Sequence, residues 1–491
     1  ANDGVADDQF GWSVALDGDT AVVGAVSDDD NGSGSGSVYV FVRSGTTWTQ
    51  HQKLVANDGV VNDQFGWSVA VDGDTIAVGE IFDDSSGGSA YVFRRDFAGD
   101  LSSTWSQVGA KLKPSDASSY PGSNFGVSVA LDGDTLVVGS HVKASQTGGA
   151  YVFTRNNAGD LSSDWTERAI LEASDGAVGD RFGNSVAIDG DTIVIGAHKD
   201  HNPDRDGGSA YIFTRNDPGS LTSAWTESKL KPDNGAADDL FGNGVSIEGD
   251  VVVIGAYGDD NSKGSNSGAV YVFWRDSTDP SGWTQVAKLT QSGIDPTTTY
   301  LTNNGGFGEQ IALDGDTVVV GARYDDDMGP NTGAAYVYVR ETPGELSSNW
   351  IHHQKLTASD VSADNNAMFG SSVAIDGDMI VIGAYADDTD KGSGSGSVYM
   401  FTLTTPGDPT SRWTHHRKLT ASDGAASDGA EFGYFGLAID GETIVVGASR
   451  VAGIDSGSGA AYVFSSLPSC DASAPPANGA VGDCTSKLIH G

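Results

Sequence analysis

Apolar and polar residues alternate along this chain in a short unit that occurs eight times. In the first copy, which runs from Phe10 to Ala25, apolar side chains stand at alternate positions on both sides of Asp17-Gly18. A period of two is that of a half-buried β-strand. The pair Asp17-Gly18 suits a two-residue turn in which both central residues have positive φ. Each copy is therefore predicted to be a β-hairpin.

Two more strands are predicted after each hairpin. The third contains a Tyr-Val-Phe motif such as Tyr39-Val-Phe41, and the fourth begins at a tryptophan such as Trp48 and usually ends in Lys-Leu. Intervals of roughly 60 residues accommodate about four short strands. The units begin at Phe10, Phe65, Phe125, Phe182, Phe241, Phe307, Phe369 and Phe432. Four antiparallel strands per unit, without helical periodicity, predict an all-β fold, an eight-bladed β-propeller over residues 1–465. Seven blades plus an extra hairpin is the alternative.

The last unit supplies only three recognisable strands. Its outer strand is expected from the tail near Ser486-Lys487-Leu488, from a strand before the N-terminus, or from a neighbouring subunit. The chain also begins in mid-repeat, because Ala1-Asn-Asp-Gly4 matches Ala56-Asn-Asp-Gly59. An open outer edge invites pairing with another chain, so self-assembly is one expectation.

The residues that frame each hairpin resemble a known family. Phe-Gly at the start of each copy and Gly-Ala at its end are similar to the FG-GAP repeat, known from the propeller of integrin α-chains. The resemblance covers roughly residues 1–465 and implies the propeller fold. Calcium-binding members of the family carry a long Asp-rich loop inside the hairpin, where this chain has only Asp-Gly-Asp. That calcium site is therefore not carried over.

The tail, residues 466–491, holds the chain's two cysteines, Cys470 and Cys484. It resembles the opening of a cysteine-rich extracellular repeat and is interpreted as the start of a further extracellular module. A disulfide between the two cysteines is predicted, which implies an oxidising compartment. Asn31-Gly-Ser33 is a sequon for N-glycosylation, so Asn31 is a candidate glycosylation site. These features predict an extracellular or cell-surface location.

The net charge of −40, from 67 acidic and 27 basic residues, argues against nucleic acid as a partner. No apolar run approaches the 18–20 residues of a membrane span, so direct membrane insertion is not expected. The charge is explained either by solubility or by cation binding.

Acidic residues gather in the segments that precede each hairpin and in the loops that follow it. Antiparallel connectivity places both sets on one face of the propeller, where their oxygens form candidate cages for calcium, which takes six to eight oxygen ligands. The candidate metal ligands are Asp8, Asp28, Asp29, Asp63, Asp83, Asp84, Asp180, Asp200, Asp239, Asp259, Asp260, Asp325, Asp326, Asp387 and Asp388.

Four units carry both halves of such a cage, whereas unit three serves as an internal control. There Ser123 and Lys143 replace the two aspartates, and unit eight has Arg450-Val451 at the corresponding place, so no cation is expected in either. The alternative is that these aspartates only form turns and solvated loops, as Asp and Asn commonly do.

Three functions are carried forward. The first is an adhesive or structural interaction module whose acidic face contacts protein or glycan, with calcium as an optional cofactor. The second is an extracellular hydrolase or lyase that acts on polysaccharide. The third is a building block of an extracellular filament. No zinc-protease or nucleophile-elbow motif occurs, and no catalytic or organic cofactor-binding residue is assigned.

Overall fold

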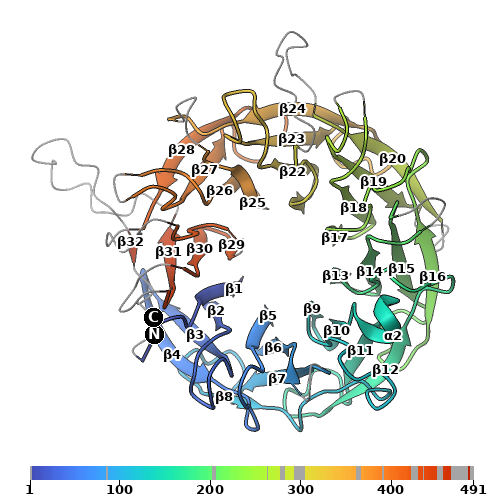
Figure 1. Cartoon of the computed structure of the whole chain (residues 1–491), viewed down its shortest axis with the longest axis vertical. Coiled ribbons are helices and arrows are strands. Elements are labelled where there is room, and N and C mark those ends of the chain that lie inside the picture. The colour runs from blue at the N-terminus through green and yellow to red at the C-terminus, as the bar shows by residue number, and fades with distance from the viewer. Residues whose placement is uncertain are drawn as a thin grey trace, which may run out of the picture.

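A computed structural model describes residues 3–83, 87–201, 206–261, 264–276, 282–291, 305–360, 366–389, 392–421, 429–434, 436–450, 457–465 and 485–486. These residues form eight four-stranded antiparallel sheets arranged as blades around a central axis (Figure 1). The first strand of each blade lies nearest the axis, and the fourth lies at the rim. The prediction of eight blades is confirmed, and the seven-blade alternative is wrong.

The strands of blades one to four follow each other in chain order. They are β1 (Phe10–Asp17), β2 (Thr20–Ala25), β3 (Ser37–Ser44), β4 (Thr47–Leu54), β5 (Phe65–Asp72), β6 (Thr75–Glu80), β7 (Ser89–Arg95), β8 (Trp105–Gln107), β9 (Val129–Asp132), β10 (Thr135–Gly139), β11 (Ala150–Arg155), β12 (Trp165–Leu171), β13 (Val186–Asp189), β14 (Thr192–Ala197), β15 (Ser209–Arg215) and β16 (Trp225–Leu230). A short helical turn, α2 (Lys143–Gln146), lies between β10 and β11.

Blades five to eight continue the same order. They contain β17 (Val245–Glu248), β18 (Val251–Ala256), β19 (Ala269–Arg275), β20 (Trp283–Leu289), β21 (Ile311–Asp314), β22 (Thr317–Ala322), β23 (Ala334–Arg340), β24 (Trp350–Leu356), β25 (Phe369–Asp376), β26 (Met379–Ala384), β27 (Ser397–Leu403), β28 (Trp413–Leu419), β29 (Leu437–Asp440), β30 (Thr443–Ala448), β31 (Ala460–Ser465) and β32 (Thr485–Ser486).

The tail supplies the outer strand of the last blade. Strand β32 pairs with β31, with Thr485 opposite Phe464 and Ser486 opposite Val463. Of the three sources considered for this strand, the tail near Ser486 is therefore the one observed. The ring closes where Phe10 of blade one forms a parallel bridge with Gly459 of blade eight.

The hairpin turn differs from the prediction by one residue. Asp17 pairs with Thr20, so Gly18 and Asp19 are the central residues, and of these only Gly18 has positive φ, at 54°. This is the φ pattern of a type II′ turn, not of the predicted type I′ turn. Asp17 stays in the strand because its carboxylate accepts a hydrogen bond from the turn of the next blade, through the Gly73 amide.

That contact is repeated around the whole ring. In every blade, the acidic residue that ends the first strand accepts a hydrogen bond from the turn glycine of the following blade. The pairs are Asp17–Gly73, Asp72–Gly133, Asp132–Gly190, Asp189–Gly249, Glu248–Gly315, Asp314–Gly377, Asp376–Gly441 and Asp440–Gly18. One set of the chain's acids therefore joins the blades to one another.

The core lies between neighbouring blades. Phe10 packs edge-on against Tyr39 at a ring-centre distance of 5.1 Å, and both belong to a buried cluster that includes Val463 of blade eight. The blades approach closely at the Gly-Ala motif, where a Cβ on Gly24 would lie 2.4 Å from the Gly66 carbonyl oxygen. The Ser13 hydroxyl donates to that same carbonyl, which explains the repeated serine of Phe-Gly-x-Ser.

Candidate binding face

Two kinds of connection meet on one side of the propeller, which we call the loop face. They are the links that enter each hairpin, such as residues 55–64, and the loops that follow it, such as residues 26–36. The Ser27 amide donates to the Asp8 carbonyl at 3.1 Å, and the Asn62 amide donates to the Ser33 carbonyl at 2.8 Å. Links and loops are therefore in direct contact on this face.

Six blades carry the same Asp–Lys ion pair on this face. In blade one, Asp28 accepts hydrogen bonds from the Tyr39 hydroxyl at 2.9 Å and from the ammonium of Lys53. The Lys53 ammonium also lies 5.1 Å from the centre of the Tyr39 ring. The Asp–Lys pairs, with their shortest N–O distances, are Asp28–Lys53 at 2.9 Å, Asp83–Lys111 at 2.5 Å, Asp200–Lys229 at 2.5 Å, Asp259–Lys288 at 2.8 Å, Asp325–Lys355 at 2.9 Å and Asp387–Lys418 at 2.7 Å.

The second acidic residue of these loops forms a hydrogen bond with the backbone of its own loop. Each accepts a hydrogen bond from an amide five or six residues later, at 2.6–2.7 Å, in the pairs Asp29–Gly34, Asp260–Asn266, Asp326–Asn331 and Asp388–Gly394. This arrangement stabilises each loop by side-chain to backbone hydrogen bonding. Asp84 lies outside the described residues.

Each aspartate of the entering links accepts a hydrogen bond from the backbone with one of its two carboxylate oxygens. The donor is the amide three residues earlier, in the pairs Asp8–Val5, Asp63–Val60, Asp180–Ala177 and Asp239–Ala236. The other oxygen of Asp8, Asp180 and Asp239 is buried without a hydrogen-bond partner among the described residues, and so is one oxygen of Asp259. Burial, together with the charge of the neighbouring Asp28 or Asp259, raises the pKa of Asp8 and of Asp239 to about 6. These oxygens can accept a proton, a water or a cation.

Blade two contains a third acid that sequence reasoning missed. Glu80 stands where most blades have the alanine of Gly-Ala, and it is fully buried. One oxygen accepts from the Tyr91 hydroxyl at 2.7 Å, and the other has no partner among the described residues. Ligand oxygens of Asp63, Glu80 and Asp83 lie within 4.8 Å of one another. Burial and the charges of Asp83 and Asp63 raise the pKa of Glu80 to about 8. Three carboxylates fit a hard divalent cation.

Blade three also places an ammonium group beside its tyrosine, but the lysine that supplies it stands at a different position in the chain. Lys143, at the loop position of Asp28, is 1% exposed, and its ammonium lies 2.8 Å from Asp116 and 2.6 Å from Glu172. It stands 5.0 Å from the Tyr151 ring centre. Ile170 occupies the strand position that Lys53 has in blade one. The ammonium therefore comes from the loop instead of the outer strand.

Near the axis, the loop face is not repeated from blade to blade. Arg323 of blade six forms an ion pair with Glu309 at 2.8 Å and donates to the Tyr434 hydroxyl of blade eight at 3.3 Å. This contact joins blade six to blade eight without blade seven, so it must lie near the axis, where the blades converge. Tyr434 also packs against Tyr385 at a ring-centre distance of 4.2 Å, and Trp12 packs against Trp67 at 5.0 Å. The signal in the sequence was the variable residue after each Phe-Gly and after each Gly-Ala.

The remaining candidates have varied outcomes. Asn31 is exposed, and its side-chain amide donates to the Ala56 carbonyl at 3.0 Å. His353 contacts the Ser411 carbonyl of the next blade at 2.8 Å. Cys470 and Cys484 lie outside the described residues, so their disulfide stays a prediction. Among the described helices, none is long and apolar enough to cross a membrane.

The eight radial sheets and their repeated Phe-Gly and Gly-Ala contacts define a β-propeller built from one tandem repeat. The chain belongs to the FG-GAP repeat family, which matches residues 1–41, 48–93, 105–153, 165–213, 225–273, 283–338, 350–401 and 413–464. FG-GAP repeats are typical of extracellular proteins.

Comparison with curated proteins gives no match. Among solved structures, the chain is similar to the periplasmic gluconolactonase of Pseudomonas aeruginosa, with 13% identity, a TM-score of 0.40, and coverage of 71% of this chain and 86% of that one. It is also similar to the β-propeller domain of the Trilobed protease from Pyrococcus furiosus, with 9% identity, a TM-score of 0.41, and coverage of 81% and 93%. Likenesses this distant carry no argument about function.

Proposed function

We propose that this protein is an extracellular interaction module that binds a protein or glycan ligand on its loop face. The supporting observation is that the blades differ from one another on the loop face near the axis and not at the turns. The hydrogen-bonded ring at the turns is the same in all eight blades, whereas the loop face near the axis combines Trp12, Trp67, Arg323 and Tyr434. Tyrosine, tryptophan and arginine are the residues that most often dominate binding energy at interfaces.

The test is a binding screen on immobilised protein, with neutral and acidic glycans and extracellular matrix proteins as probes. Trp67→Ala and Tyr434→Ala are expected to weaken binding of a hit by tenfold or more. Phe97→Ala is the matched control, because Phe97 is 70% exposed and lies in a β7–β8 connection on the opposite face. Absence of any ligand, or equal loss with Phe97→Ala, would contradict the proposal.

Calcium is the cation that this face is proposed to take, and blade two is its strongest site. Asp63, Glu80 and Asp83 together offer three carboxyl groups, and the proton that the raised pKa of Glu80 keeps on it near neutral pH is released when a cation binds. In blades one, four and five the corresponding cage has only two carboxylates, Asp8 with Asp28, Asp180 with Asp200 and Asp239 with Asp259, and the second of each pair is already bound to a lysine. These predicted cages are therefore ranked below blade two.

The matched variant for this site is Glu80→Ala, because alanine is the residue of most other blades. Calcium binding to the folded protein raises the melting temperature by mass action. We expect Glu80→Ala to abolish the tightest calcium-binding event in calorimetric titration and most of that rise. An unchanged titration would remove calcium from blade two and leave the ligand-binding proposal standing.

A further inference from the structure

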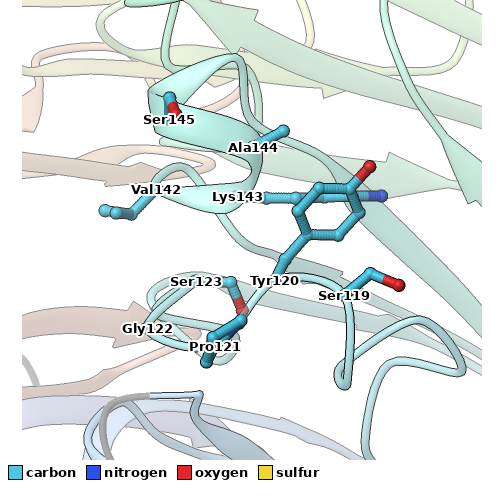
Figure 2. Close-up of a pocket in the computed structure, with 9 residues that line it drawn as sticks. All are labelled: Ser119, Tyr120, Pro121, Gly122, Ser123, Val142, Lys143, Ala144 and Ser145. Carbon is cyan, nitrogen blue, oxygen red and sulfur yellow. The ribbon is translucent and has the colours of Figure 1, made fainter.

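Blade three contains a pocket of about 480 Å³ on the loop face. Its walls are the entering link, Ser119–Ser123, and the segment Val142–Ser145 that follows the hairpin (Figure 2). The Tyr120 ring stands between the two walls, with the Lys143 side chain running beside it. The volume lies in the range of sites for small organic ligands.

The pocket exists because unit three departs from the repeat. Ser123 and Lys143 replace the two aspartates of blade one. The wall that follows the hairpin folds back in a left-handed turn, with φ of 51° at Ala144, 61° at Ser145 and 71° at Gln146. This conformation is unfavourable for residues that carry a side chain, so the surrounding contacts must maintain it.

Hydrogen bonds tie the two walls to each other. The Val142 amide donates to the Ser123 carbonyl at 3.2 Å, and the Ser140 hydroxyl donates to the same carbonyl at 2.9 Å. The Gly148 amide closes the turn on the Lys143 carbonyl at 3.0 Å. The pocket is therefore preformed, and a ligand need not order it.

The lining combines an aromatic face with unused hydroxyl groups. Ser119 and Ser145 are exposed, and neither their hydroxyls nor that of Tyr120 forms a hydrogen bond with another described residue. The one charged group, the ammonium of Lys143, is already paired with Asp116 and Glu172, and it lies 5.3 Å from the centre of the Tyr120 ring, so the opposite face of that ring is the one available to a ligand. The pocket therefore offers hydroxyls and an aromatic ring without a free charge.

We infer that this pocket binds a sugar residue of a neutral glycan. The C–H groups on one face of a pyranose stack on the electron-rich face of an aromatic ring, while its hydroxyls exchange hydrogen bonds with Ser119 and Ser145. An apolar ligand would leave these hydroxyls unpaired. An anionic ligand would meet the field of a chain with a net charge of −40. This inference rests on the proposed function and names one ligand class and its place.

The test uses the whole protein and four neutral trisaccharides as probes, namely maltotriose, cellotriose, mannotriose and xylotriose, with trigalacturonate as the anionic counterpart. Binding is followed by saturation-transfer NMR and isothermal calorimetry. The variants are Tyr120→Ala, which removes the ring, and Tyr120→Phe, which keeps it. Val60→Ala, at the equivalent position of blade two, is the matched control. Melting temperatures confirm that each variant is folded.

We expect at least one neutral trisaccharide to bind, Tyr120→Ala to weaken it tenfold or more, and Tyr120→Phe and Val60→Ala to change it less than threefold. Preference for trigalacturonate, or neutral binding that Tyr120→Ala leaves intact, would overturn the assignment. A protein that binds matrix proteins through Trp67 but none of these sugars would also overturn it, while the proposed function stands. No ligand of any kind would remove both.

Discussion

Blade one and blade three place an ammonium group beside the same tyrosine but take it from different positions in the chain. Lys53, on the outer strand β4, lies 5.1 Å from the Tyr39 ring centre, and Lys143, in the loop, lies 5.0 Å from that of Tyr151. The ammonium of Lys53 is surrounded by Asp3, Asp28 and Asp30, whereas that of Lys143 is held by Asp116 and Glu172. What the two blades share is therefore the position of the ammonium group beside the tyrosine, and not the place of the lysine in the sequence.

The two blades also differ in how deeply they bury the opposing charge. The Asp28 side chain is 4% exposed, and Asp8, with its own buried carboxylate, lies close by. In blade three, Ser123 takes the position of Asp8, and the side chains of Asp116 and Glu172 are 24% and 56% exposed. Loss of the lysine should therefore cost more in blade one than in blade three.

The largest effect is expected from Lys53→Met. This change leaves Asp28 buried without its counter-ion, which costs about 3–5 kcal/mol in the free energy of unfolding. Urea denaturation at neutral pH measures it. Lys231→Met is the control, since Lys231 is exposed and should change stability by less than about 0.5 kcal/mol. Equal stability of the two variants would show that the cluster is dispensable.

Lys143→Met is expected to cost less, about 2–4 kcal/mol, because water can reach the carboxylates it leaves behind. The same denaturation experiment measures it, with Lys231→Met again as control. A loss larger than that of Lys53→Met would mean that burial of the carboxylates does not set the cost.

A smaller effect concerns the second residue after the final glycine of the hairpin, which is Val26 in blade one, His141 in blade three and His198 in blade four. Burial, with the nearby charge of Arg181, lowers the pKa of both His141 and His198 to about 4. An unfolded histidine binds its proton near pH 6.5, so the unfolded state takes up more protons between pH 6.5 and 4. Stability should therefore fall as the pH falls through that window, by about 2 kcal/mol per histidine at pH 5.

The measurement is the melting temperature from pH 7.5 to 5 for the wild type and for His198→Val, which copies blade one. We expect the variant to lose less stability on acidification. His416→Gln controls for removal of an exposed imidazole. Parallel curves for the wild type and His198→Val would contradict the assignment of a buried neutral histidine.

The fold could be predicted because eight copies of one hairpin leave few other arrangements, and Phe10 and Gly24 have the same packing role in each. The turn was misplaced by one residue because the hydrogen bond from Gly73 to Asp17 comes from another blade, which a local turn pattern does not include. Asp28 and Lys53 lie on different elements, so the acids alone suggested metal ligands. The signal was present, however, since each of the six units with the loop aspartate carries Lys-Leu after the tryptophan of its fourth strand, whereas unit three has Ile170-Leu171 there.

The most direct test of this account is a double-mutant cycle in blade three. Ile170 occupies the place of Lys53, opposite Tyr151, so Ile170→Lys should return the ammonium that Lys143→Met removes. The account predicts that Lys143→Met/Ile170→Lys unfolds within about 1 kcal/mol of the wild type, with a coupling energy well above the error of the cycle. Losses that simply add would contradict the claim that the position of the cation, and not its place in the sequence, is what the loop face requires.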